Sequence, residues 1–326
     1  MSETVLSLKD FRVTFPTMLG DVQAVRGIDL DVHAGELVGV VGESGSGKSV
    51  TFLGVMGLLP KSARITGSAT IRGTELVGAS NKVQRTVRGK RIAMIFQDPL
   101  SALNPVHKVG AQIVEMLQAH QDLSKDAAHK RAVELLDLVG IPQPDQRAMQ
   151  YPHEFSGGMR QRVMIAMAIA NDPEVLIADE PTTALDVTVQ AQILEVIQRV
   201  QRELNAAVVF ITHDLGVIAR IADRVQVMYA GRAAERGEVH DILLRPTHPY
   251  TQGLLDSLPA SGRERLTPIA GAPPNMLRPP AGCAFGPRCP HAVAEVCGAT
   301  LPALRPFGTV ETACLRAEEL QAEVAR

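Results

Sequence analysis

The sequence contains no tryptophan, and its aromatic residues make up only 3% of 326 residues. It also lacks a charge excess of either sign, because 33 Lys and Arg residues nearly balance 35 Asp and Glu residues. Proteins that bind nucleic acid commonly combine a basic surface with aromatic side chains that stack on bases. These two shortages therefore give no support to a nucleic-acid-binding protein. The hydrophobic content of 45% is enough for a sizeable core.

Long apolar runs are missing as well. One of the longer runs, VMIAMAIA at residues 163–170, is far shorter than the ~20 residues that span a bilayer. The sequence begins MSETVLSLKDF, which places charged residues where a signal peptide needs an apolar stretch. These patterns predict a soluble, cytoplasmic protein, which can still dock on a membrane protein.

Short apolar runs rich in β-branched residues alternate with helical patterns, which is typical of a parallel α/β sheet. Residues 188–204 carry apolar residues on one stripe and predict an amphipathic helix. The sequence between residues 98 and 172 is mostly helical and predicts a helical subdomain inserted in the α/β core. The predicted strands span residues 36–42, 91–97, 175–179 and 207–212, and a further helix spans residues 48–59.

The composition changes after about residue 237. Seven prolines fall between residues 268 and 290, and the strand signals fade. The sequence therefore predicts two domains, residues 1–236 and residues 237–326, of which the second is small and rich in loops.

The stretch GESGSGKS at residues 42–49 fits the phosphate-binding pattern G-x-x-x-x-G-K-[ST], with a predicted strand before it and a helix after it. Glycines let backbone N–H groups approach an anion, and the helix start adds its positive dipole end. The alternative is a glycine-rich turn without a ligand. We expect Lys48 to reach the β- and γ-phosphates and the Ser49 hydroxyl to bind Mg²⁺. The predicted nucleotide-binding residues here are Gly42, Glu43, Ser44, Gly45, Ser46, Gly47, Lys48, Ser49 and Val50.

A second acidic motif, VLIADE at residues 175–180, ends a predicted buried strand with two carboxylates. Asp179 is placed to hold Mg²⁺, and Glu180 is placed to polarise an attacking water. The alternative is an acidic strand end that caps the next helix. Together with the phosphate loop, the motif predicts hydrolysis of a bound nucleotide.

The stretch FSGGMRQR at residues 155–162 resembles the signature motif of ATP-binding cassette (ABC) ATPases, usually written LSGGQ. Ser156, Gly157 and Gly158 open a helix, so they offer N–H donors and a hydroxyl to an anion. The resemblance implies that this second cradle caps ATP bound to a partner subunit. Phe155 and Met159 depart from the usual form, and Met159 removes an amide that would contact the ribose.

Further positions match the same family, and the resemblance covers residues 5 to about 236. It implies a P-loop α/β core with an antiparallel β subdomain and a helical subdomain, and ATP and Mg²⁺ as ligands. Gln97 resembles the glutamine that contacts Mg²⁺ and senses the γ-phosphate, and ALD at residues 184–186, which includes Asp186, resembles a dimer contact. His213 resembles the histidine that holds the γ-phosphate. Phe15 is the candidate for stacking on adenine, although it fits an edge-strand core residue equally well.

A narrower resemblance extends over the rest of the chain. FQDPLSALNP (96–105), THPYT (247–251) and the cysteine-bearing tail look like the ATPase subunits of dipeptide and oligopeptide importers. This implies an ATPase at the cytoplasmic face of the membrane with two transmembrane permease subunits, a second and paralogous ABC ATPase, and indirectly an extracytoplasmic solute-binding protein. The alternatives are a soluble ABC ATPase that acts on nucleic acid or ribosomes, and a mainly structural subunit. The catalytic residues that the resemblance assigns are Glu180, His213 and Lys48.

The cysteines all lie late in the chain, as Cys283, Cys289, Cys297 and Cys314. Their spacing, C-x5-C-x7-C-x16-C, is looser than the C-x2-C pairs of most zinc sites. Four thiolates in a segment rich in proline and glycine suit an iron–sulfur cluster, and the resemblance to peptide-importer ATPases implies a [4Fe–4S] cluster of structural role. A zinc site, or unligated cysteines in a small packed module, remain alternatives. His291 is a further candidate ligand, or a solvated histidine.

Overall fold

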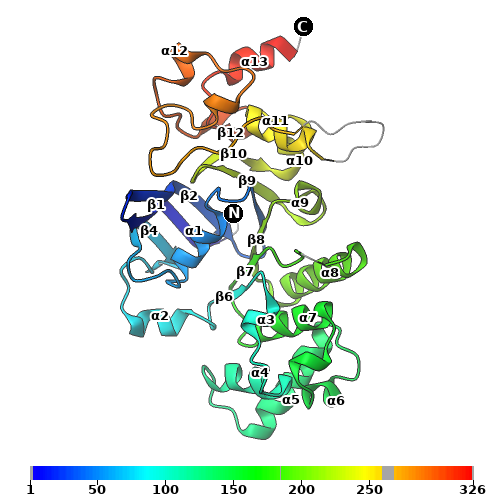
Figure 1. Ribbon diagram of the computed structural model, residues 1–326. Coiled ribbons are helices and arrows are strands. Elements are labelled where there is room, and N and C mark those ends of the chain that lie inside the picture. Colours follow the sequence, from blue (N-terminus) through cyan, green and yellow to red (C-terminus); the bar gives the residue numbers. More distant parts are fainter. Residues whose placement is uncertain (1–2, 184, 259–267, 325–326) are drawn as a thin grey trace. The chain divides into compact units, whose positions relative to one another are not determined.

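The computed structural model describes residues 3–183, 185–258 and 268–324 (Figure 1). These residues form two compact units. The first unit draws its residues from Met1–Leu6, Val32–Leu37 and Ala79–Phe210, and the second from Ser7–Asp31, Val38–Gly78 and Ile211–Arg326. In the described parts of the chain, every helix is too short or too polar to serve as a membrane span.

The first unit contains three neighbouring strands in the order β8-β7-β6. All five residues of β7 and all four of β6 are buried, and the two strands run parallel with Ile92 opposite Val175. Strands buried on both faces need an unbroken apolar sequence, and VLIAD and IAMI come close to that. The strands are β6 (Ile92–Ile95), β7 (Val175–Asp179) and β8 (Ala207–Thr212), of which most of β8 belongs to this unit.

The helices of the first unit include a group, α4 to α7, whose members pack on one another (Figure 1). Helices α5 and α7 each begin after a serine, Ser124 and Ser156, whose hydroxyl accepts a backbone N–H from the first turn. Helix α8 buries Ile193, Ile197 and Val200 along the stripe that the sequence predicts. The helices are α2 (Asn81–Val87), α3 (Pro99–Ala102), α4 (Val109–Gln118), α5 (Lys125–Leu138), α6 (Pro144–Ala148), the 3-10 helix η1 (Pro152–Glu154), α7 (Gly157–Ala168) and α8 (Val187–Leu204).

The second unit contains most of a four-stranded sheet in the order β2-β1-β4-β5. Strand β1 buries Leu6 and Leu8 before Asp10, and Phe11 and Val13 after it. Apart from Val5, which is also buried, the buried positions change from even to odd numbers at Asp10, whose φ of 43° is left-handed. One residue in this conformation lets both halves of the strand face the same core. The strands are β1 (Thr4–Thr17), β2 (Gly20–His33), β4 (Arg64–Ile71) and β5 (Thr74–Glu75).

A second set of strands in this unit has the order β11-β12-β10-β9-β3. Strand β3 is fully buried and runs parallel to β9, with Val38 opposite Arg224. Helix α1 follows β3 and ends earlier than the predicted residue 59, because Gly57 adopts a left-handed φ of 60° and the Leu58 N–H bonds back to the Leu53 carbonyl. The elements are β3 (Leu37–Val41), α1 (Lys48–Val55), α9 (Leu215–Ile221), β9 (Arg224–Tyr229) and β10 (Arg232–Glu238).

The chain after residue 238 consists of short helices, short strands and loops. Strand β12 pairs antiparallel with β10, with Glu235 opposite Thr312, so residues from the end of the chain extend the sheet. The predicted boundary between residues 236 and 237 falls within β10 and stays a prediction. The elements are α10 (Val239–Leu244), α11 (Pro249–Asp256), the 3-10 helix η2 (Gly286–Arg288), α12 (Ala294–Cys297), β11 (Arg305–Phe307), β12 (Val310–Thr312) and α13 (Ala317–Val324).

Candidate nucleotide site and cysteine pocket

The predicted phosphate loop lies between the end of β3 and the start of α1. Its glycines are required by shape: a Cβ on Gly42 would lie 2.2 Å from the Met228 carbonyl oxygen, and one on Gly47 would lie 2.6 Å from the Ala24 carbonyl oxygen. Both glycines have positive φ angles, 151° and 98°. Only a chain without side chains at these two positions can follow this path past the neighbouring backbone.

The loop also holds polar groups that suit a phosphate. The Lys48 ammonium is buried and donates to the carbonyl oxygens of Gly42 and Glu43, at 2.7 and 3.0 Å. The Ser46 hydroxyl is buried and has no hydrogen-bond partner among the described residues. A buried hydroxyl without a partner is costly, and an incoming phosphate oxygen would satisfy it. The loop thus fits the triphosphate of a nucleotide.

The other loop residues lie where a nucleotide can reach them. Ser44 and Gly45 are exposed at the tip of the loop, and Ser49 and Val50 are half-buried in the first turn of α1. Phe15 is half-buried on β1, an exposure that fits either of its predicted roles. His213 is exposed and directly follows β8, before Asp214 caps helix α9.

In the first unit, the structure brings Gln97 and Glu180 together. The Gln97 side-chain amide donates to Glu180 Oε2 at 3.1 Å, and the Thr183 hydroxyl donates to the same oxygen at 2.8 Å. Asp179 is buried at the end of β7. Glu180 has a φ of 46°, which is uncommon for a residue with a side chain. Strain of this kind persists where the surroundings hold a side chain in one position, as at active sites.

The Ser-Gly-Gly segment begins α7. The Ser156 hydroxyl accepts a hydrogen bond from the Met159 N–H at 3.4 Å, and both Ser156 and Gly157 are exposed. Gly158 packs so closely on α8 that a Cβ there would lie 2.5 Å from Val189 Cγ1. The motif therefore fits two roles. Gly158 allows a close contact between two helices, and the exposed helix start can bind an anion.

Asp186 is exposed and caps helix α8, where its carboxylate accepts the Val189 N–H at 2.9 Å. Of the predicted ALD segment, Ala184 lies outside the described residues. The predicted nucleotide residues are divided between the two units: the phosphate loop, Phe15 and His213 belong to the second, and the remainder to the first. Their roles toward ATP and Mg²⁺ stay predictions.

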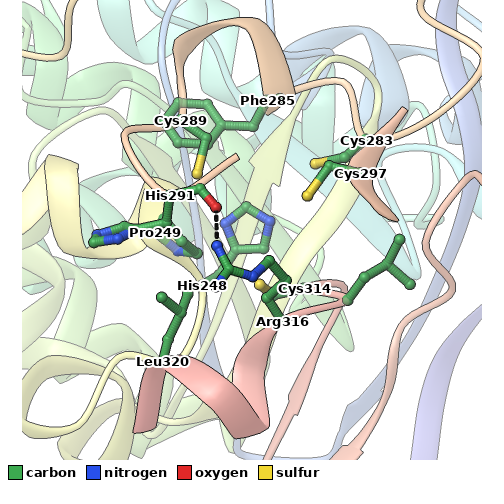
Figure 2. A pocket seen from close by; sticks show the side chains of 12 residues that line it. His248, Pro249, Cys283, Phe285, Cys289, His291, Cys297, Cys314, Arg316 and Leu320 are labelled. Atoms are coloured by element: carbon green, nitrogen blue, oxygen red, sulfur yellow. Dashed lines mark hydrogen bonds between the residues drawn. The ribbon is translucent and has the colours of Figure 1, made fainter. Parts of the chain in front are cut away.

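The four cysteines line one pocket in the second unit (Figure 2). None forms a disulfide, and the Cys283 N–H donates to the Cys297 carbonyl at 2.7 Å. Burial raises the pKa of Cys283 and Cys289, and that of Cys314 to about 11. Such thiols are poor nucleophiles unless a cation binds them. Within the described ranges, no group of three or more His, Cys, Asp or Glu side chains is arranged to hold a single metal ion.

Two histidines line the same pocket. His291 is there, as the sequence predicts for a candidate ligand, and its carbonyl accepts a hydrogen bond from Arg316 (Figure 2). His248, which the sequence analysis missed, is buried, and burial lowers its pKa to about 4. Its Nδ1 accepts the Tyr250 N–H at 3.0 Å. The ring is therefore neutral, with a single N–H at Nε2.

Comparison with known proteins identifies the family to which the chain belongs. The family profile described as "ABC transporter" matches residues 25–183, and that described as "Oligopeptide/dipeptide transporter, C-terminal region" matches residues 234–297. A similar solved structure is the post-hydrolysis dimer of the ATP-binding cassette MJ0796, bound to ADP and Pi. It matches with a TM-score of 0.65 and 26% sequence identity, over 72% of this chain and 98% of the MJ0796 chain. These findings confirm the predicted P-loop ABC fold. They define a class, the ABC-type ATPases.

Within that class, the relatives are peptide-transport proteins, and the chain belongs to this branch of the ABC transporter family. It is 54% identical to the oligopeptide transport ATP-binding protein OppD of Bacillus subtilis (strain 168), over 89% of this chain and 82% of that protein. It is 53% identical to the dipeptide transport ATP-binding protein DppD of the same organism, over 92% of this chain and 90% of that protein. The relatives favour a transport ATPase over the alternative that acts on nucleic acid or ribosomes.

Proposed function

We propose that this chain is the ATP-hydrolysing subunit of an importer that takes up di- and oligopeptides or similar small solutes. The observation that carries the proposal is identity above 50% with peptide-transport ATP-binding proteins over about nine tenths of the chain. The match of residues 234–297 to the C-terminal region of such transporters supports it further. The chain acts at the cytoplasmic face of the membrane, together with two permease subunits and a solute-binding protein outside.

The proposed chemistry is hydrolysis of ATP by the residues described above. Lys48 and the backbone of the phosphate loop hold the phosphates and offset the charge that develops during transfer. The Ser49 hydroxyl, Gln97 and Asp179 are the groups that would hold Mg²⁺, which supplies further charge neutralisation when it is bound. Glu180 accepts a proton from the attacking water, because a carboxylate at this place can act as a general base.

The proposed roles of the other residues concern the γ-phosphate, the adenine and the partner. His213 holds the γ-phosphate, and Phe15 stacks on the adenine. Ser156, Gly157 and Gly158 cap an ATP molecule bound to a second ATPase subunit. The exposure of Ser156 and Gly157 supports this role, because a partner can reach them. Asp186 then lies at the contact between the two subunits.

We further propose that the four cysteines hold a [4Fe–4S] cluster of structural role. Support comes from the four half-buried thiols that line one pocket, without disulfides, in a segment with few long helices or strands. Such a cluster is held by cysteine thiolates, and bound iron would offset the cost of forming thiolates at these partly buried positions. Zinc is the alternative metal, and its signature would be zinc without iron in the purified protein.

The experiment that tests the transport function is purification of the tagged chain from membranes, followed by identification of what stays bound. The proposal predicts two multi-spanning permease subunits and a second, paralogous ABC ATPase. Recovery of the chain with ribosomes or nucleic acid, and with no membrane protein, would overturn it. The purified chain alone should hydrolyse ATP slowly, with a specific activity that rises with concentration, because each phosphate loop needs the Ser156 segment of a partner.

A further inference from the structure

Two residues of the C-terminal region contact the phosphate loop. Glu43, the second residue of the loop, forms a two-pronged ion pair with Arg288, whose two terminal nitrogens lie 2.7 and 3.0 Å from the two carboxylate oxygens. The Arg288 side chain is 5% exposed and that of Glu43 is 25% exposed. Two parallel N–H···O bonds of this kind fix orientation as well as charge. The pair therefore fixes the side chain of one loop residue.

A second contact fixes the backbone of the same residue. The Glu43 N–H donates to the Tyr250 hydroxyl at 2.8 Å, and Tyr250 is fully buried. The hydrogen-bonding capacity of this N–H is therefore satisfied by a residue of the C-terminal region. Residues 207 and 245 positions later in the sequence thus hold the backbone and the side chain of Glu43.

Arg288 is itself anchored in the C-terminal region. Its Nε donates to the Ala270 carbonyl at 2.9 Å, and its guanidinium lies 5.8 Å from the ring centre of Tyr229 and 5.9 Å from that of Phe285. Arg288 ends helix η2 and directly precedes Cys289, and Phe285 lines the cysteine pocket. One continuous set of contacts therefore joins the cysteine pocket to the phosphate loop.

We propose that Arg288 and Tyr250 are positioning residues for the nucleotide, so that the affinity for ATP depends on an intact C-terminal region. This inference rests on the proposed function, in which the loop at Glu43 binds ATP. The Glu43 carboxylate sits in a loop that must accept a triphosphate, and like charges at close range weaken binding. Arg288 offsets that negative charge, and Tyr250 keeps the loop backbone in the shape that the phosphates need.

The test measures equilibrium binding of ATP with Mg²⁺ to the full-length chain and its variants. Arg288→Ala should raise the Kd for ATP roughly tenfold, which corresponds to about 1.4 kcal/mol. Adding Glu43→Gln to Arg288→Ala should recover part of that loss, because the carboxylate left without its partner is gone. Tyr250→Phe removes only the hydroxyl and should raise the Kd about threefold.

Arg305→Ala is the matched control. Arg305 also forms an ion pair in the C-terminal region, with Glu318 at 2.7 Å, and donates to the Cys314 carbonyl at 3.3 Å. Its removal perturbs the surroundings of a cysteine without touching Glu43, so the Kd for ATP should stay within about twofold of wild type. Thermal unfolding of each variant shows whether it is folded. If Arg288→Ala does not fold, Arg288→Lys, which keeps the charge and loses the two-pronged geometry, takes its place and should raise the Kd about threefold.

Three results would overturn the inference: an unchanged Kd in folded Arg288→Ala or Arg288→Lys, an equal loss in Arg305→Ala, or no recovery on adding Glu43→Gln. The first two would make the ion pair a purely structural contact. The third would mean that the loss does not act through the Glu43 charge. Failure of the wild-type chain to bind ATP at all would instead refute the proposed function, so the two claims are tested separately.

Discussion

Replacing Glu180 with glutamine removes one negative charge and leaves the local shape intact. In the structure, the Gln97 amide and the Thr183 hydroxyl both donate to Glu180 Oε2, at 3.1 and 2.8 Å. The side-chain oxygen of a glutamine can accept the same two hydrogen bonds. The left-handed backbone at this position, with a φ of 46°, is about equally costly for either residue, since both are unbranched at Cβ. We therefore expect Glu180→Gln to fold normally.

The expected loss is in the chemical step. A general base typically contributes about 10²–10⁴ in rate, which corresponds to roughly 2.7–5.4 kcal/mol in activation free energy. Phosphate release by the assembled transporter should fall by that factor. The Kd for ATP should change by no more than about threefold, because the carboxylate acts on the water and does not bind the phosphates.

Glu174→Gln is the matched control. Glu174 precedes β7 by one residue and pairs with Arg91 at 2.8 Å, both side chains being about one quarter exposed. Removing this charge should cost at most about 1 kcal/mol in the free energy of unfolding and leave turnover close to wild type. Turnover by Glu180→Gln at a near-normal rate would refute the assignment of the general base. An equal fall in the turnover of Glu174→Gln would show that losing any charge near β7 slows hydrolysis, and that the effect is not specific to Glu180.

Three further predictions concern the phosphate loop, the helix contact and the cysteines. Lys48→Ala should weaken ATP binding itself, at least roughly tenfold by equilibrium binding, and unchanged affinity would contradict the phosphate-loop assignment. Gly158→Ala places a Cβ 2.5 Å from Val189 Cγ1 and should lower the free energy of unfolding by about 1–3 kcal/mol. Gly157→Ala is the control: its Cβ lies 3.9 Å from the nearest atom, so thermal unfolding should show a smaller loss of stability. Cys289→Ser should reduce the iron content from about four atoms per chain, while ATP binding persists in weakened form. If the wild-type protein is purified in the absence of air and is found to contain no iron, the cluster is contradicted.

The parts of the site that lie in one short stretch could be predicted from the sequence. The run LVGVV is continuous and apolar, so it predicts a buried strand. The glycines that follow it are required, because a side chain at Gly42 or Gly47 would collide with backbone. The VLIAD run is equally local, and all five of its residues are buried in β7. In both places polar residues directly follow a buried strand, so the motif can be recognised from neighbouring residues in the sequence.

The contacts of the C-terminal region could not be predicted in this way. Arg288 and Glu43 are 245 residues apart, and the sequence around Arg288 shows neither helical nor strand periodicity. The stretch THPYT resembles importer ATPases, but nothing in it indicates that the Tyr250 hydroxyl accepts the Glu43 N–H or that His248 lines the cysteine pocket. Such contacts depend on how distant segments pack. The early end of α1 was missed for a local reason, since Gly57 stops the helix although the apolar pattern continues.

The central claim is that ATP hydrolysis by this chain drives peptide import, and uptake by proteoliposomes tests it most directly. The complex that purifies with the chain is reconstituted together with its solute-binding protein, with ATP supplied on the side of the ATPase subunits. We expect a labelled oligopeptide to accumulate only when ATP is present, and we expect Glu180→Gln in this chain to reduce that uptake strongly. ATP hydrolysis by the complex without uptake of any di- or oligopeptide would contradict the claim.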